Sequence, residues 1–265
     1  MSVAPATPTV PTVPAGPVAA ATPVVAVLRS EWIKIRSVRA SWGSLLAILL
    51  VTTALTVLAY GTIGESEAAN GGNRVKEAFY TMNFAQVAAL AYGATAVSSE
   101  YREGALRVSL AAVPRRGLLH CCKTAVIAVT ALLVSVPTTF AAFLVGQAFL
   151  GEHAIGLSHP GVLQACVGGA VYLVLMALFA AGVTVLLRSA VGALGILVPF
   201  VLVGSFVLGD GAGGIGAYLP DRAGSHFFRE TSPGPLGPWE GLAVTALWAA
   251  AALVAGWWAM RRRDA

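Results

Sequence analysis

The sequence predicts an all-α membrane protein with six transmembrane helices, and three observations lead to that class. Apolar residues make up 57% of the 265 residues, and the mean hydropathy is +0.78. Both values lie far above those of soluble domains. A helix needs about 20 residues to cross roughly 30 Å of hydrocarbon, and six apolar runs reach that length. Charged residues, only 11% of the chain, lie mostly between these runs.

The six predicted spans form one transmembrane domain over residues 41–263, with short connections between most of them. The spans are residues 41–63, 79–99, 121–150, 162–187, 190–209 and 239–260. Only Arg188 and Ser189 separate the fourth span from the fifth, so these two should be antiparallel neighbours. The longer connection at 210–238 contains apolar pieces that we expect to dip back into the interface as short helices.

The first 23 residues have a different composition from the rest of the chain. Proline recurs every few residues in 1–23, and no side chain there is charged. Proline restricts the backbone and removes a hydrogen-bond donor, so the segment should stay extended and disordered. It also lacks a basic stretch before an apolar core, which argues against a signal peptide. We therefore expect a disordered cytoplasmic tail.

Residues 24–40 are predicted to form an amphipathic helix that lies along the membrane surface. One helical face is apolar and consists of Val25, Leu28, Trp32 and Ile35. The other side is charged and consists of Arg29, Glu31, Lys34 and Arg36. On this reading the basic side chains meet lipid phosphates and the indole sits at headgroup depth. The alternative is a stretch near the membrane without a mechanical role.

Two amide side chains lie inside the second predicted span. Asn83 and Gln86 are three residues apart, which places them on one face of a helix. Amides are costly against lipid, so this face should look into the bundle or into a hydrated cavity. Two interpretations stay open: a surface along which a substrate passes, or hydrogen bonds between neighbouring helices.

The most unusual stretch is 98–123, a charged interruption between the second and third spans. It contains five of the 17 basic residues, namely Arg102, Arg107, Arg115, Arg116 and Lys123. Leu106, Leu110 and Val113 fall on one face of a helix that Pro114 should stop. Such a helix, tied at both ends to membrane spans, can receive force from a soluble partner. The alternative is a solvated loop whose arginines only orient the protein.

The distribution of basic residues predicts that both termini are cytoplasmic. If the chain crosses six times, one side holds 13 basic residues: Arg29, Lys34, Arg36, Arg39, Arg102, Arg107, Arg115, Arg116, Lys123, Arg188, Arg261, Arg262 and Arg263. The other side holds 4, namely Arg74, Lys76, Arg222 and Arg229. Lysine and arginine concentrate on the cytoplasmic side of membranes. An odd number of spans would destroy this agreement, because every later connection would change sides.

The sequence lacks the motifs of an enzyme. It has no phosphate-binding G-x-x-x-x-G-K-[ST], no H-E-x-x-H and no G-x-S-x-G. His153 and His159 lack the spacing and the third ligand of a metal site. The three cysteines, Cys121, Cys122 and Cys166, fit best as small apolar fillers. We therefore expect no catalytic activity, no metal and no cofactor in this chain.

Two stretches resemble a known family. The segment SEWIKIRSVRASW before the first span and the segment SSEYREGALRVSLAAVPRR after the second resemble the membrane subunit of bacterial ABC transporters of the ABC-2 exporter class. The similarity extends over roughly residues 28–263 with six spans in the same order. The resemblance implies a cytoplasmic ATPase partner that binds ATP and Mg, a second permease subunit in a homodimer or heterodimer, and a location in the bacterial plasma membrane.

The resemblance also assigns roles to particular residues. In this family the loop between spans two and three carries the coupling helix that docks on the ATPase. By position this element contains Glu100, Arg102, Glu103, Gly104, Leu106 and Leu110. The interfacial helix would contain Glu31, Trp32 and Lys34. The family's segment between spans five and six commonly forms short re-entrant helices, which suits residues 215–228.

The function that follows is an expectation: ATP-driven export of an amphipathic, lipid-like or drug-like substrate, powered by a separate subunit. A rival is a membrane anchor or sensor that recruits a cytoplasmic partner through its basic loops without transport. The rival predicts a tightly bound partner that has no ATPase activity. A membrane-embedded enzyme is a third possibility, and activity of the purified chain alone would identify it.

Overall fold

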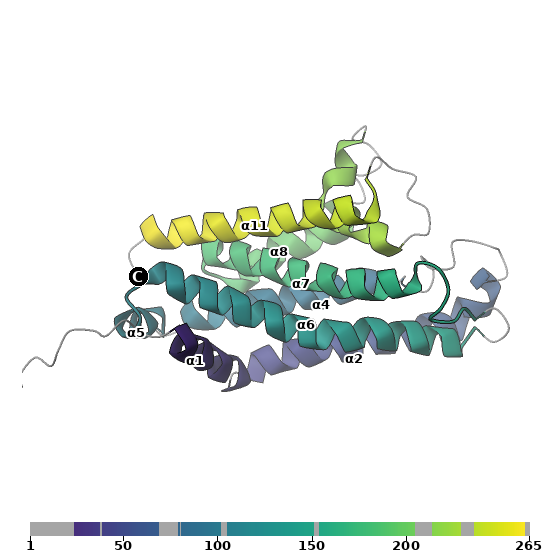
Figure 1. Ribbon diagram of the computed structural model, residues 1–265, viewed down its shortest axis with the longest axis horizontal. Coiled ribbons are helices and arrows are strands. Elements are labelled where there is room, and N and C mark those ends of the chain that lie inside the picture. The colour runs from purple at the N-terminus through teal and green to yellow at the C-terminus, as the bar shows by residue number, and fades with distance from the viewer. Residues whose placement is uncertain are drawn as a thin grey trace, which may run out of the picture.

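The structure, a computed structural model, is an elongated bundle of helices (Figure 1). It describes residues 24–37, 39–68, 79, 81–101, 105–150, 154–204, 214–228 and 236–262. Every regular element within these ranges is a helix, as the apolar composition predicts. The tail 1–23 lies outside the described residues, as does His153.

Six helices form the body of the bundle. They are α2 (Arg39–Ala68), α4 (Met82–Ser98), α6 (Arg116–Ala148), α7 (Val162–Leu187), α8 (Ala190–Pro199) and α11 (Pro238–Arg262). Each of these helices begins within about five residues of the start of the corresponding predicted span. Helix α7 is the central element, because it packs against α4, α6, α8 and α11. Its sequence is almost entirely apolar or small, as a helix that is enclosed by neighbours requires.

Four of these helices are long and apolar enough to cross a membrane, rather than the six that the sequence predicts. They are α2 from Ser41 to Thr62, α6, α7 and α11. Helix α4 has only 17 residues and carries Asn83 and Gln86 near its start. The described apolar part of the α8 region is also short, Ala190–Val203, and beyond Pro199 it contains a π-helical stretch, Phe200–Gly204.

Close helix contacts in the core depend on residues without a side chain. A Cβ atom added to Gly93 of α4 would lie 1.9 Å from the carbonyl oxygen of Ala177 in α7. A Cβ atom added to Gly182 of α7 would lie 2.5 Å from the backbone of Ala252 in α11. Both distances are impossible for real atoms. Small residues let membrane helices approach closely, so these positions set the spacing of α7 from both neighbours.

Short helices occupy the two ends of the bundle. At one end lie α1 (Val24–Ser37), the 3-10 turn η1 (Ser99–Tyr101) and α5 (Ala105–Ala112), close to the C-terminus (Figure 1). The other end carries η4 (Ile215–Tyr218), α10 (Pro220–Gly224) and η5 (Ser225–Phe228). We call these the α5 end and the α10 end.

The turn between α7 and α8 is as tight as the sequence predicts. Arg188 adopts a left-handed backbone conformation with φ 55°, which ends α7. The hydroxyl of Ser189 then accepts a hydrogen bond from the backbone N–H of Gly192 and caps α8. Two residues thus reverse the chain, and α7 and α8 pack against each other.

Candidate functional site

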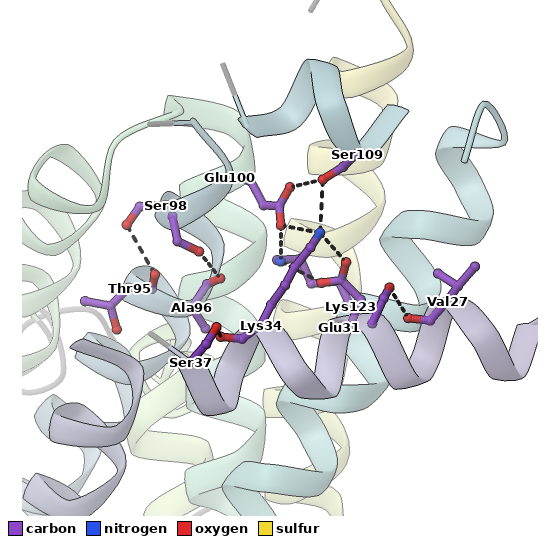
Figure 2. Close-up of polar contacts among 12 residues, drawn as sticks. Val27, Glu31, Lys34, Ser37, Thr95, Ala96, Ser98, Glu100, Ser109 and Lys123 are labelled. Atoms are coloured by element: carbon purple, nitrogen blue, oxygen red, sulfur yellow. Dashed lines mark hydrogen bonds and ion pairs between the residues drawn. The ribbon is translucent and has the colours of Figure 1, made fainter. Parts of the chain in front are cut away.

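A cluster of polar side chains from four elements lies at the α5 end (Figure 2). It consists of Glu31 and Lys34 from α1, Glu100 from η1, Ser109 from α5 and Lys123 from α6. We call these five residues the charged cluster. It joins segments up to 92 positions apart in the sequence. The helix before the first long helix is thereby connected to the loop between α4 and α6.

Each lysine of the charged cluster bonds both glutamates. The Nζ of Lys34 donates to Oε1 of Glu31 at 2.7 Å and to Oε1 of Glu100 at 3.0 Å. The Nζ of Lys123 donates to Oε2 of Glu31 at 2.8 Å and to the same Oε1 of Glu100 at 2.9 Å. All four distances are those of charge-assisted hydrogen bonds.

Ser109 brings α5 into the same network. Its hydroxyl accepts a hydrogen bond from Nζ of Lys34 and donates one to Oε2 of Glu100, both at 3.0 Å. A hydroxyl can act as donor and acceptor at once, so a single side chain bonds α5 both to α1 and to η1. Any movement of α5 away from the bundle must break these bonds.

The charged cluster is largely enclosed, with matching numbers of positive and negative groups. The side chain of Glu31 is 1% exposed and that of Glu100 8%, while Lys123 is 12% exposed. Lys34 is the most accessible member at 38%. Because buried charges are costly unless they are paired and hydrogen-bonded, the two lysines and two glutamates depend on one another.

The surroundings shift the pKa values of Glu100 and Lys34 in the directions that favour their charged forms. Burial alone would raise the pKa of Glu100, but the charges and hydrogen bonds of Lys123 and Lys34 outweigh it and hold this pKa below its usual 4.5. Burial alone would lower the pKa of Lys34, but Glu31 and Glu100 outweigh it and hold this pKa above its usual 10.5. The paired ions are thus the stable forms around neutral pH.

An apolar layer supports the charged cluster on the α5 side. Leu106 and Val113 are buried against Val27 of α1 and Leu119 of α6, with Leu110 partly buried beside them. This is the apolar stripe that the sequence predicts for the helix at 98–123. The opposite face of α5 is open, and Val108 on it is 72% exposed. The helix therefore packs one face against the bundle and exposes Val108 on the opposite face.

The charged cluster also lies next to the turn that starts α8. The guanidinium carbon of Arg188 lies 5.9 Å from the ring centroid of Tyr101, the residue after Glu100. This distance is within the range of a cation–π contact. Through it, η1 touches the end of α7 as well as the end of α4.

Glu31, on the predicted charged side of α1, is buried in the charged cluster rather than solvated. The face of α1 that packs against the bundle consists of Val27, Glu31 and Ile35. Val25 and Trp32 of the predicted apolar face lie on the surface of the protein. Lys123 gives Glu31 its partner inside the fold.

The remaining predicted site residues fall into two groups. Arg102, Glu103 and Gly104 lie outside the described residues. The amides of α4 point in different directions, because Asn83 is exposed and Gln86 is buried. Gln86 accepts a hydrogen bond from the hydroxyl of Tyr172 in α7. For Gln86 the structure therefore favours hydrogen bonding between helices.

Sequence reasoning missed the roles of Lys123 and Ser109. The sequence predicts only that Lys123 is one of the basic residues on the cytoplasmic side of the membrane. A signal was present, because a lysine just inside the third predicted span needs a negative partner. The sequence did not say which of the acidic residues this partner is. For Ser109 no signal existed, since serine is common on helix surfaces.

Within the described ranges, no group of three histidine, cysteine, aspartate or glutamate side chains could hold a metal ion. The chemistry that the charged cluster offers is mechanical and electrostatic: it connects helices and responds to charge. Four apolar helices of membrane length indicate an integral membrane protein. The charged cluster joins the helices at one end of its bundle.

Comparison with known proteins identifies the family. The model of the ABC-2 family transporter protein matches residues 27–204, about two thirds of the chain. The chain belongs to this family and is a membrane permease component of an ABC transporter. No curated protein and no solved structure matches it. The matched range begins in α1 and includes every residue of the charged cluster.

Proposed function

We propose that this chain is the permease subunit of an ATP-driven exporter in a bacterial plasma membrane, and that α5 is its coupling helix. In this proposal α4 and α8 join the four long apolar helices to make six spans, with both termini cytoplasmic. A separate cytoplasmic ATPase binds ATP and Mg, and a second permease subunit completes the translocation path. The cargo is amphipathic, lipid-like or drug-like.

One observation carries the coupling role: the charged cluster bonds α5 to segments that adjoin or belong to three helices of the bundle. Glu100 lies in η1, which follows α4, Lys123 belongs to α6, and Lys34 lies in α1, which precedes α2. A push on α5 therefore acts on several helices together. The contact of Tyr101 with Arg188 extends this connection to the turn between α7 and α8.

The exposed face of α5 is where the ATPase would dock. The proposed contact is centred on Val108, an apolar side chain that is 72% exposed on this helix. Arg107 is exposed beside Val108, and an apolar centre with a charged rim is typical of protein interfaces. The buried stripe of α5, by contrast, is occupied within the chain.

The test uses Val108→Asp in membranes that contain the partner ATPase. We expect loss of most of the permease-dependent ATP turnover, because a carboxylate replaces an apolar contact at the centre of the interface. Membrane insertion and the melting temperature should be unchanged, since the side chain is exposed. Val108→Ile is the matched control and should retain turnover. A charge at Leu106 would be a poor test, because this side chain is buried and the substitution would disrupt the fold.

The same experiment addresses the rival function. If the ATPase co-purifies with the wild-type chain and no transport-linked ATP turnover is found, the chain is an anchor for that partner. If Val108→Asp keeps full turnover, α5 does not dock the ATPase through this face and the coupling assignment is wrong.

A further inference from the structure

A small pocket lies between the charged cluster and α11. Glu100 and Lys123 of the charged cluster line it, together with His120 of α6 and Leu253 of α11, among others. Its volume is about 20 Å³, far below the roughly 300–1,000 Å³ of sites that bind small organic molecules. One water molecule needs about 10–15 Å³ of cavity volume and two to four polar partners. The pocket therefore has the size for a single water molecule.

His120 brings a buried nitrogen to this pocket. Its Nε2 atom is buried and has no hydrogen-bond partner within the described part of the chain. The ring does form a hydrogen bond with the backbone of Leu253 in α11. Because Nε2 takes no part in that bond, the bond belongs to Nδ1, which then carries the proton. In the neutral ring Nε2 is an acceptor, and a buried acceptor without a donor is costly.

Lys123 has one N–H group to spare on the same face of α6. An ammonium group has three N–H donors. Two of them bond Oε2 of Glu31 and Oε1 of Glu100, at 2.8 and 2.9 Å (Figure 2), and among the described residues Lys123 makes no third bond. His120 precedes Lys123 by three residues, so the two side chains share one face of the helix. A donor and an acceptor that both lack a partner thus come from two residues that line one pocket.

We propose that the pocket holds one resident water molecule, which accepts a hydrogen bond from Nζ of Lys123 and donates one to Nε2 of His120. Its second hydrogen goes to Glu100. The carboxylate of Glu100 accepts three bonds, from Lys34, Lys123 and Ser109, of about four that such a group can take. The water then has three partners, the usual number for a buried water.

The charges along the pocket favour a neutral occupant over an ion. Among the described residues that line it, Glu100 is the acidic one and Lys123 the basic one, and the two already form an ion pair at 2.9 Å. A cation in the pocket would be repelled by Lys123, and an anion by Glu100. Water avoids both costs, because it donates and accepts hydrogen bonds without a net charge.

The water extends the charged cluster to the last helix of the bundle. The direct bonds of the cluster join α1, η1, α5 and α6. Through the water and His120 the hydrogen bonds continue to Leu253 of α11. His120 is thus a positioning residue that fixes the third N–H group of Lys123. The inference goes beyond the proposed function, and its test needs no ATPase, so failure of the coupling assignment would leave it standing.

The experiment is a crystal structure of the full chain in a lipidic mesophase, at a resolution that shows ordered water. We expect one density peak about 2.7–3.2 Å from both Nζ of Lys123 and Nε2 of His120. His120→Gln keeps an acceptor at this position and should keep the peak. His120→Met has a similar length without an amide and should lose it. Leu253→Met changes the pocket wall without removing a polar side chain, so this control should keep the peak.

Thermal unfolding in detergent gives a second measurement on the same variants. His120→Met should lower the melting temperature by about 4 °C, because the third N–H group of Lys123 then loses its buried acceptor. His120→Gln should recover most of this loss. Recovery by glutamine distinguishes hydrogen bonding from simple filling of space, since methionine and glutamine have similar volumes.

Several results would overturn the proposal. These are the absence of a peak in the wild-type pocket, a peak that persists in His120→Met, and equal melting temperatures for the methionine and glutamine variants. Crystals soaked in bromide or in rubidium provide a further check. An anomalous signal from either ion at the peak would show that the pocket takes an ion instead of water.

Discussion

At the α5 end of the bundle, two lysines and two glutamates join the helices, whereas at the α10 end the contacts are aromatic. There Phe79 stacks on Phe143 and on Phe228, with ring centroids 5.9 and 5.4 Å apart, and Tyr172 meets Phe228 edge-on at 6.2 Å. We call these four residues the aromatic cluster. The two clusters lie at opposite ends of the molecule, the aromatic one beside the short light-green helices of Figure 1.

The two kinds of contact respond differently to mutation and to pH. Ion pairs depend on charge and direction, so neutralising one group leaves its partners buried without compensation. Aromatic contacts depend on volume and shape, and they do not respond to moderate changes in pH. The predictions below test this contrast, starting with the largest effect.

Replacing Lys123 by methionine should produce the largest loss of stability. The variant leaves Glu31 and Glu100 with a single lysine between them, and breaking a buried pair costs about 3–5 kcal/mol. Thermal unfolding of the detergent-solubilised protein measures the effect. Lys34→Met is the matched control, because Lys34 is 38% exposed and should cost only about 1 kcal/mol. Equal losses in the two variants would contradict the assigned geometry.

Truncating Phe228 to alanine should cost slightly less. It removes both ring contacts from the buried aromatic cluster, and the cavity that remains lowers the unfolding free energy by about 3 kcal/mol. Phe228→Leu keeps most of the volume and should cost about 1 kcal/mol. If leucine is as damaging as alanine, the ring stacking rather than the filled volume stabilises this end.

Acid should loosen the α5 end before the α10 end. The pKa of Glu100 is depressed in the folded state, so its stabilising contribution is complete above 4.5 and is lost as pH falls through the lower folded value. The pKa of Lys34 is raised, so its contribution is complete below 10.5 and is lost only as pH rises through the higher folded value. Between 4.5 and 10.5 neither contribution should change.

Two native thiols can report on this difference. Cys122 is buried beside the charged cluster and Cys166 is buried in α7 near the other end. In a Cys121→Ser background, the reaction of Cys122 with a dithiodipyridine, which also works in acid, should accelerate several-fold below about pH 4. Cys166 should change much less. Parallel acceleration of both thiols would indicate global unfolding instead.

The sequence predicts the helices better than it predicts their contacts. Apolar length alone places α2, α6, α7 and α11 within a few residues, because the cost of burying the backbone in lipid leaves few alternatives. The apolar stripe of α5 also follows from its spacing. The environment of Gln86 in α4 is less visible in the sequence, since its partner, the hydroxyl of Tyr172, belongs to α7.

The candidate site is harder to predict, for a reason that Glu31 illustrates. A charged residue in a short amphipathic helix is usually solvated, and its local neighbours support that expectation. Its partner Lys123 lies 92 residues away, and a single sequence contains no record of which distant charges meet. The residues of the site could be named in part, but the bonds between them required the fold.

Both lysines bond the same carboxylate oxygen, Oε1 of Glu100. Lys123 also bonds Glu31 of α1, so α1 and α6 are joined through both glutamates at once. Separating the two helices therefore requires breaking the bonds of a buried carboxylate, which costs far more than the loss of a solvated ion pair.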